Sequence, residues 1–152
     1  MATVQGKIWQ VKINDTVIRC QTDATLNLVT NTSEVEACKP IGGDEGDVSW
    51  VNYNVDSQGW DISFSGQAFA DSVTMNQADL IDLFIDGDVM VEVDFYTNNS
   101  VKGFDGTQII TYSGQGIMTG ITLNGPTTGA STYDVTIQGT GAITSTRTPI
   151  TT

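Results

Sequence analysis

Two carboxylates, Glu92 and Asp94, are the residues best placed to do chemistry, because they are two positions apart in a segment of alternating polarity. Side chains at i and i+2 of a β-strand lie on the same face. Two carboxylates on one face could act as a general acid and a general base. The same pattern also describes the solvent-facing side of an ordinary strand, and no other motif completes a catalytic site. We therefore expect that the protein is not an enzyme.

Histidine is absent from all 152 residues. This excludes a histidine general base, a histidine-activated nucleophile and a histidine metal ligand. Cys20 and Cys38 are the only cysteines, too few for a zinc site. Either they form a disulfide or, as we expect for a protein made in a reducing compartment, they are free thiols.

Acidic residues gather in two short segments that offer oxygen ligands of the kind calcium prefers, Asp44-Glu45-Gly46-Asp47 and Asp86-Gly87-Asp88. Neither segment has the spacing of an EF-hand loop. Solvated turns explain both segments more simply, so we expect no metal and no cofactor.

Three tryptophans, Trp9, Trp50 and Trp60, could together form a platform for sugar rings. Each also lies beside apolar residues of an expected strand. Aromatic side chains in that position usually belong to a core or an interface. We expect the latter, and keep a carbohydrate-binding module as an alternative function.

The net charge of −12 limits the partners of the chain, which has 18 acidic and 6 basic residues. Binding to nucleic acid and to anionic membranes both depend on Lys and Arg. The apolar runs are too short to cross a membrane, and the first residues do not resemble a signal peptide. We expect assembly inside a cell and no membrane partner.

The elements that must position these residues are mostly strands, since 16 glycines and many threonines accompany alternating apolar residues. Strands are expected at residues 6–13, 17–20, 21–37, 49–53, 60–69, 89–96, 108–123 and 133–143. A turn at residues 56–59 separates two of them. Glycines within 108–123 predict bends or bulges.

One helix is expected at about residues 75–86, where the apolar period changes from two to nearly four. Thr74 and Gln77 have the spacing of a capping box. The apolar stripe consists of Leu80, Ile81, Phe84 and Ile85. Gly87 should end the helix in a left-handed conformation.

Two segments are expected to lie outside the strands. Residues 39–48 form an acidic, glycine-rich loop, and the threonine-rich residues 144–152 form a C-terminal arm. The predicted organisation is therefore a single β domain at residues 1–143, followed by the arm.

The order of these elements resembles that of the major tail proteins, or tail tube proteins, of long-tailed bacteriophages. The resemblance rests on the segments Gly6–Ile13, Cys20–Leu26, Gly59–Gln67, the single capped helix, Tyr112–Gly120 and Tyr133–Ile143. It covers nearly the whole chain in order, although no single motif is diagnostic.

This resemblance implies a β-sandwich or half-barrel with one flanking helix. It further implies hexameric rings with a shared inner barrel, stacked into a tail tube around a tape-measure protein. Tail terminator and initiator proteins would be further partners, and DNA would pass through the tube without specific binding. The protein would belong to the tail of the virion, assembled in the cytoplasm of a host bacterium.

The resemblance also suggests roles for individual residues. Glu92 and Asp94 would line the lumen, where negative charge keeps DNA from adhering. The inter-ring contacts would involve Asp44, Glu45 and Asp47 in the loop, and Thr148 and Ile150 in the arm. Besides the carbohydrate-binding module, an alternative is the inner tube of a contractile injection or secretion system, which shares the fold.

Overall fold

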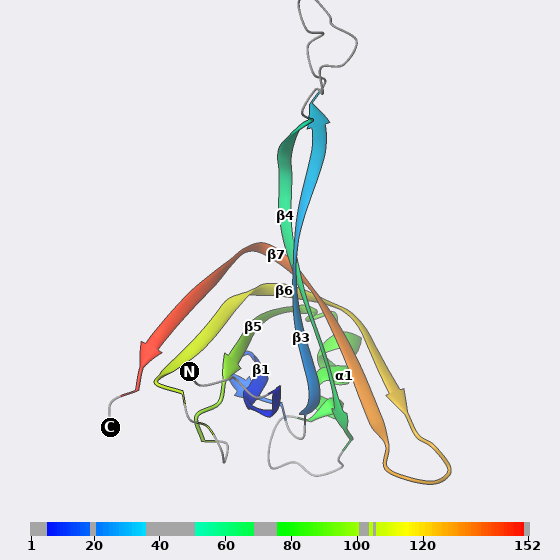
Figure 1. The fold of residues 1–152 in the computed structure, drawn as a ribbon. Coiled ribbons are helices and arrows are strands. Elements are labelled where there is room, and N and C mark those ends of the chain that lie inside the picture. The colour runs from blue at the N-terminus through cyan, green and yellow to red at the C-terminus, as the bar shows by residue number, and fades with distance from the viewer. Residues whose placement is uncertain are drawn as a thin grey trace, which may run out of the picture.

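In a computed structural model, the described residues form a single antiparallel sheet of seven strands with one α-helix (Figure 1). The structure describes residues 6–18, 21–35, 51–68, 76–100, 104 and 106–150. After a 3-10 turn at Gly6–Ile8, the elements are β1 (Trp9–Ile13), β2 (Thr16–Val17), β3 (Gln21–Val35), β4 (Asn52–Gln67), α1 (Gln77–Ile85), β5 (Met90–Thr97), β6 (Gln108–Asn124) and β7 (Thr132–Pro149). This confirms the predicted class, a mostly β chain with one helix.

The strands are hydrogen-bonded in the order β2-β1-β5-β6-β7-β4-β3, and the sheet curls into a half-barrel. Gln21, at the start of β3, connects this last strand of the order to β1, which lies near the other end. Its amide oxygen accepts from the Val11 N–H at 2.8 Å, and its amide nitrogen donates to the carbonyls of Val11 at 2.8 Å and Ile18 at 3.0 Å. The side chain thus supplies hydrogen bonds to β1 that a neighbouring strand would otherwise make.

The core lies inside this curl. Its members alternate along their strands, as expected when one sheet face is dry. They are Val11, Ile13, Ile18, Trp60, Ile62, Phe64, Leu80, Val91, Val93, Phe95, Met118, Tyr133, Val135 and Ile137. Tyr133, Val135 and Ile137 form the inward face of β7, each being at most 1% exposed.

The pair β6–β7 bends sharply, as the arch in Figure 1 shows. Trp60 lies against the glycines of this bend. Gly141 has φ +77°, and β7 has three residues opposite the single Gly114 of β6. The Trp60 indole N–H donates to the Gly141 carbonyl at 3.1 Å. A Cβ atom at Gly139 would lie 2.2 Å from the indole ring, so only glycine fits there. The predicted bend at glycines of β6 is confirmed.

Helix α1 begins two residues later than the predicted capping box requires. Its N-cap is Asn76 rather than Thr74, which lies outside the described residues. The Asn76 side chain accepts from the Ala78 N–H at 2.9 Å, and the Asp79 carboxylate accepts from the Asn76 N–H at 3.1 Å. The capping box of α1 therefore joins Asn76 and Asp79, and the predicted pairing of Thr74 with Gln77 lies outside the described residues. Gly87, with φ +82°, follows the helix end as predicted.

Only part of the predicted apolar stripe of α1 is buried. Leu80 is fully buried, whereas Phe84 and Ile85 are 41% and 74% exposed. The helix therefore contacts the core through its first turns, and its last turn leaves two large apolar side chains in solvent.

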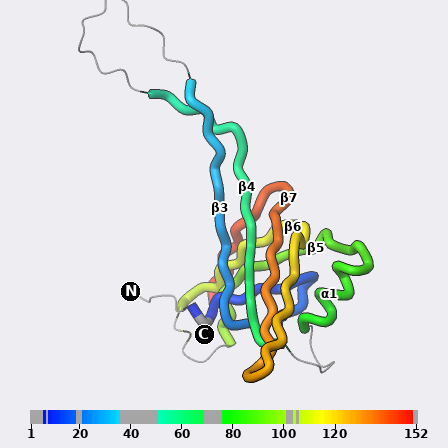
Figure 2. The backbone as a smooth tube through the Cα atoms, turned by 90° about the vertical axis from the view of Figure 1, so that its right-hand side faces the viewer, coloured from blue at the N-terminus to red at the C-terminus, as the bar shows by residue number. Residues whose placement is uncertain are grey.

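A long hairpin of β3 and β4 projects beyond the rest of the sheet (Figures 1 and 2). β4 pairs with β7 only over residues 61–67, whereas it pairs with β3 as far as Asn52. The turn predicted at residues 56–59 is wrong, because these residues continue β4. Their turn-like composition reflects a β-bulge, at which the register between Ser57 and Val55 skips Asp56.

The last strand, β7, continues through the predicted start of the C-terminal arm. Residues 144–149 pair with residues 108–113 of β6. The strand boundary expected at residue 143 is therefore a bulge at the bend and not a strand end. Elsewhere, β2 is confined to Thr16–Val17, shorter than the strand predicted at residues 17–20.

Candidate functional site

Glu92 and Asp94 project from the face of β5 opposite the core, as predicted. They pair across the strands with Gln115 and Ser113 of β6. Together with residues of the β7 bend, these residues line an open hollow of about 380 Å³. Glu92 is exposed and Asp94 half-buried. Solvent can therefore enter this carboxylate-lined hollow on the outer face of the sheet.

The backbone beneath these carboxylates is held by the β1–β2 turn. Asn14 and Asp15 have φ +50° and +65°, the left-handed conformations of a two-residue hairpin turn. The Asn14 side chain accepts from the Glu92 N–H at 3.1 Å, and its own N–H donates to the Glu92 carbonyl at 2.9 Å. The turn thus fixes the position of β5 at the edge of the hollow.

Tyr96 continues the same strand face but is only 8% exposed. The ammonium of Lys12 lies 4.5 Å from its ring centroid, within the range of a cation–π contact. Burial, with a smaller contribution from the Asp94 carboxylate, raises the pKa of the Tyr96 hydroxyl above its ordinary value. The neutral hydroxyl is therefore favoured here.

The described residues contain no group of three or more His, Cys, Asp or Glu side chains that could hold a metal ion. Asp86 and Asp88 lie within this part of the chain. Asp44, Glu45, Asp47, Cys20 and Cys38 lie outside it. In the same described part, no helix is long and apolar enough to cross a membrane.

Two of the three tryptophans are described, and both pack against other residues of the sheet. Trp60 is 3% exposed and belongs to the core. Trp9 is half-buried and stacks on Phe95, with ring centroids 5.1 Å apart, and on Tyr112 at 6.1 Å. The prediction that these two residues are packing aromatics is confirmed, while Trp50 lies outside the described residues.

Among the residues that the structure describes, the projecting hairpin carries several exposed apolar side chains, which sequence reasoning missed. In the antiparallel register, Leu28 shares a face with Trp60, Thr32 with Val55, and Glu34 with Tyr53. Leu28, Tyr53 and Val55 are 64%, 62% and 65% exposed. The core-facing side of the half-barrel therefore continues along the hairpin, and the described residues do not cover it there.

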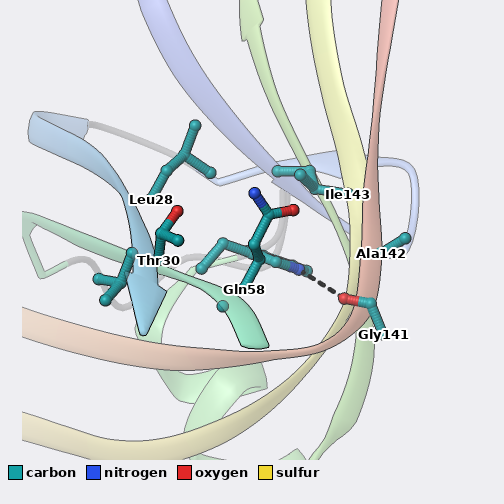
Figure 3. A pocket seen from close by; sticks show the side chains of 9 residues that line it. Leu28, Thr30, Gln58, Gly141, Ala142 and Ile143 are labelled. Atoms are coloured by element: carbon teal, nitrogen blue, oxygen red, sulfur yellow. Dashed lines mark hydrogen bonds between the residues drawn. The ribbon is translucent and has the colours of Figure 1, made fainter. Parts of the chain in front are cut away.

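A hollow of about 230 Å³ marks the point where this uncovered face begins (Figure 3). Leu28, Thr30 and Gln58 line it from the hairpin, and Ala142 and Ile143 from the bend of β7. The bend of β7 at Gly141 and the β3–β4 hairpin thus line the same partly apolar hollow.

Open strand edges within the described part of the chain include those of β3 and β7. β3 is last in the strand order, so no described strand pairs with its outer edge. The start of β3, at Gln21, bonds to β1. β7 pairs only with β6 from residue 139 onward. Thr148 is exposed on that edge, and the half-buried Ile150 follows it, its N–H donating to the Thr107 carbonyl at 3.0 Å. Open edges of this length are able to pair with another chain.

Comparison with known proteins gives matches at the level of structure only. No protein-family model matches the sequence, and no curated protein matches it either. One similar solved structure is a chain from the virion of a native gene transfer agent particle, with a TM-score of 0.69 and 20% identity. Another is a chain from the tail of an empty particle of this kind, refined with helical and C6 symmetry, with a TM-score of 0.67 and 19% identity.

Each comparison covers 95% of this chain and 99% of the other chain. The similarity therefore extends over the whole fold and not over a shared sub-structure. At such low identity it establishes a common fold, and that fold occurs in chains of a virion and of its tail.

Proposed function

We propose that this protein is a structural subunit of a phage-type tail that polymerises as stacked hexameric rings into a tube for DNA delivery. The observation that carries this proposal is the match over nearly the full chain to a tail chain with C6 symmetry. Open strand edges and an uncovered apolar hairpin support it, because both are features of a subunit that is completed by neighbours.

We further propose that Glu92 and Asp94 face the lumen. They lie on the non-core face of the sheet, in a hollow open to solvent. Repeated around a ring, they would give the channel a negative wall that repels the phosphate backbone, so that DNA passes without binding. No catalytic role is proposed for them.

The inter-ring contacts are proposed to involve the acidic loop, with Asp44, Glu45 and Asp47, and the end of β7, with Thr148 and Ile150. The exposed position of Thr148 on an open edge supports its part. Tape-measure, terminator and initiator proteins would be the other partners of the tube, in a virion tail assembled in the host cytoplasm.

Electron microscopy of the purified protein tests the polymer directly. We expect rings or tubes with a central channel and sixfold symmetry, favoured by high protein concentration and by salt that screens the charge of −12. A chain that stays monomeric up to millimolar concentration at every ionic strength would contradict unaided polymerisation. Retention on a polysaccharide column would then support the carbohydrate-binding alternative.

Thiol labelling tests the lumen. In a Glu92→Cys variant, a reagent too large to enter the channel should modify residue 92 quickly in monomers and slowly in tubes. Peptide mapping separates this site from Cys20 and Cys38. Equal labelling rates in monomers and tubes would place Glu92 outside the lumen while leaving the tube itself intact.

A further inference from the structure

The ammonium of Lys12 lies on the same sheet face as the carboxylates of Glu92 and Asp94. Lys12 of β1 and Asp94 of β5 are directly opposite partners in the antiparallel register, and the side chains of such a pair project from one face. Val11 and Ile13, on either side of Lys12 in the sequence, are fully buried in the core. Because side chains alternate along a strand, Lys12 belongs to the outer face that we propose as the wall of the lumen.

Tyr96 holds the Lys12 ammonium at a defined place on this face. The ammonium lies 4.5 Å from the centroid of the Tyr96 ring, a distance typical of a cation–π contact. The ring is itself fixed, because the Tyr96 hydroxyl donates to the side-chain oxygen of Gln10 at 3.4 Å. The Asn98 amide donates to the same oxygen at 2.9 Å. The positive charge of Lys12 therefore has a fixed position among the carboxylates.

The carboxylate of Asp94 lies within electrostatic range of this position. It contributes to the raised pKa of the Tyr96 hydroxyl, whose ring lies under the Lys12 ammonium. Opposite charges that face each other across two antiparallel strands attract. Lys12 and Asp94 are both half-buried, and salt screens partly buried charges less than exposed ones. Seen from another molecule, these two charges nearly cancel, and Glu92 supplies the net charge of this region.

The neighbouring strands add no further charge to this face. The described residues of β6 and of the end of β7 that project the same way are mostly hydroxyl or amide side chains, such as Thr111, Ser113, Gln115, Thr144 and Thr146. Within residues 9–13, 90–97, 108–117 and 144–149, the outer face therefore has one positive and two negative charges. Removing the Lys12 charge would double the net negative charge of this face.

We propose that Lys12 sets the charge of the lumen wall and thereby allows the subunits to assemble. This inference rests on the proposed tube, in which the faces that carry Glu92 and Asp94 surround a common axis. Repulsion between equal charges grows with the square of the charge, so halving the net charge of each face with Lys12 weakens the repulsion between faces about fourfold. The remaining negative charge of Glu92 still keeps DNA from adhering.

Lys12→Met tests this role, because it removes the charge and keeps a side chain of similar length over Tyr96. Sedimentation of the polymer across a salt series measures the critical protein concentration. At the lowest salt concentration at which the wild type polymerises, Lys12→Met should need about tenfold more protein. At about 1 M salt, where the Debye length is about 3 Å, the difference should fall below about twofold. Lys12→Gln should behave like Lys12→Met, and Lys12→Arg like the wild type.

Two further variants separate the charge of this face from the charge of the whole chain. Thr128→Asp makes the chain more negative by the same amount as Lys12→Met, but residue 128 lies in the exposed loop between β6 and β7. This matched control should polymerise nearly like the wild type. Asp94→Asn in the Lys12→Met background returns the face to its original net charge and should restore polymerisation. Circular dichroism and thermal melting should confirm that each variant folds.

The failures of this test are distinguishable. If Lys12→Met polymerises as readily as the wild type, or Thr128→Asp is impaired to the same degree, the role of Lys12 is wrong and the polymer stands. A defect of Lys12→Met that persists at 1 M salt, or that Asp94→Asn does not relieve, would come from lost packing on Tyr96 and would also overturn the proposal. If the wild type itself never polymerises, the polymer and the role of Lys12 are both overturned.

Discussion

Gly139→Ala tests how the bend of β6 and β7 over Trp60 is built. An added Cβ at this position would lie 2.2 Å from two atoms of the indole ring and 2.6 Å from its nitrogen. The ring cannot withdraw freely, because it is 3% exposed and its N–H donates to the Gly141 carbonyl. The substitution must therefore displace the indole ring or the bend.

The expected loss of stability follows from three terms. Overpacking a tight core site costs about 1–3 kcal/mol, and losing the indole hydrogen bond costs about 1 kcal/mol more. Replacing glycine by alanine also stabilises by roughly 0.4–1 kcal/mol, because it restricts the unfolded chain. The net loss should be about 1–3.5 kcal/mol, which lowers the melting temperature by roughly 2–14 °C for a chain of this size.

Thermal unfolding of dilute protein at low ionic strength, followed by circular dichroism, measures this loss on the unassembled chain. Gly59→Ala is the matched control, since Gly59 also lies in a strand but an added Cβ there would meet no atom within 4 Å. The control should melt at the wild-type temperature or slightly above it.

A Gly139→Ala variant that melts within a degree of the Gly59→Ala control would refute the reasoning. A double-mutant cycle adds a second criterion. In a Trp60→Leu background the clash is gone, so the further effect of Gly139→Ala should fall below 1 kcal/mol (roughly the size of the remaining backbone term). Additive effects would mean that Gly139 acts independently of the indole ring.

Three further predictions concern other parts of the half-barrel. Gln21→Ala should lower the free energy of unfolding by about 1–3 kcal/mol, because it leaves the Val11 N–H and carbonyl without their side-chain partner. Hydrogen exchange at the Val11 amide should accelerate, and an unchanged rate would argue against this bond between Gln21 and β1. Asn76→Ala should lower the free energy of unfolding by about 1 kcal/mol through loss of the helix N-cap, whereas Asn76→Asp should keep most of the stability. Equal stabilities of the two variants in chemical denaturation would contradict the capping role of Asn76. The raised pKa of Tyr96 means that the unfolded state releases this proton first, so the contribution of Tyr96 to stability should be constant below pH ~10 and be lost as the pH rises through the folded-state pKa. Tyr96→Phe should lessen this alkaline loss, and an identical pH profile would show that Tyr96 does not contribute to it.

Much of the fold follows from alternation in the sequence. The inward residues of β5 and β7, the Asn14–Asp15 turn and the face that carries Glu92 and Asp94 could all be predicted, because one side of each strand is dry. Local patterns of this kind are strong where a strand has a buried face.

The errors arise where long-range pairing overrides local signals. The segment Asp56–Gly59 has the composition of a turn, but pairing with β3 holds it in an extended strand with a bulge. Similarly, residues 144–149 have few apolar side chains, and only their pairing with β6 makes them a strand.

The exposed apolar side of the β3–β4 hairpin could not be recognised either, for a different reason. Leu28, Tyr53 and Val55 have the same residue types as core positions. Whether such residues are covered depends on how far β7 runs alongside β4, and this register is not encoded in any local pattern. The same applies to the hollow shared by the hairpin and the β7 bend.

The place of β7 between β6 and β4 has a consequence for synthesis on the ribosome. β3 and β4 are translated early, but they join the sheet only through residues 132–138 of β7. At about 5–20 residues per second, the roughly 70 residues between these partners take about 4–14 s to translate. During that interval the β3–β4 hairpin of the nascent chain has no strand of the sheet to pair with, and Trp60 lacks the β7 glycines against which it packs. A ribosome-bound chain stalled before residue 132 should therefore be protease-sensitive in β4, and one that exposes residue 149 should be protected there.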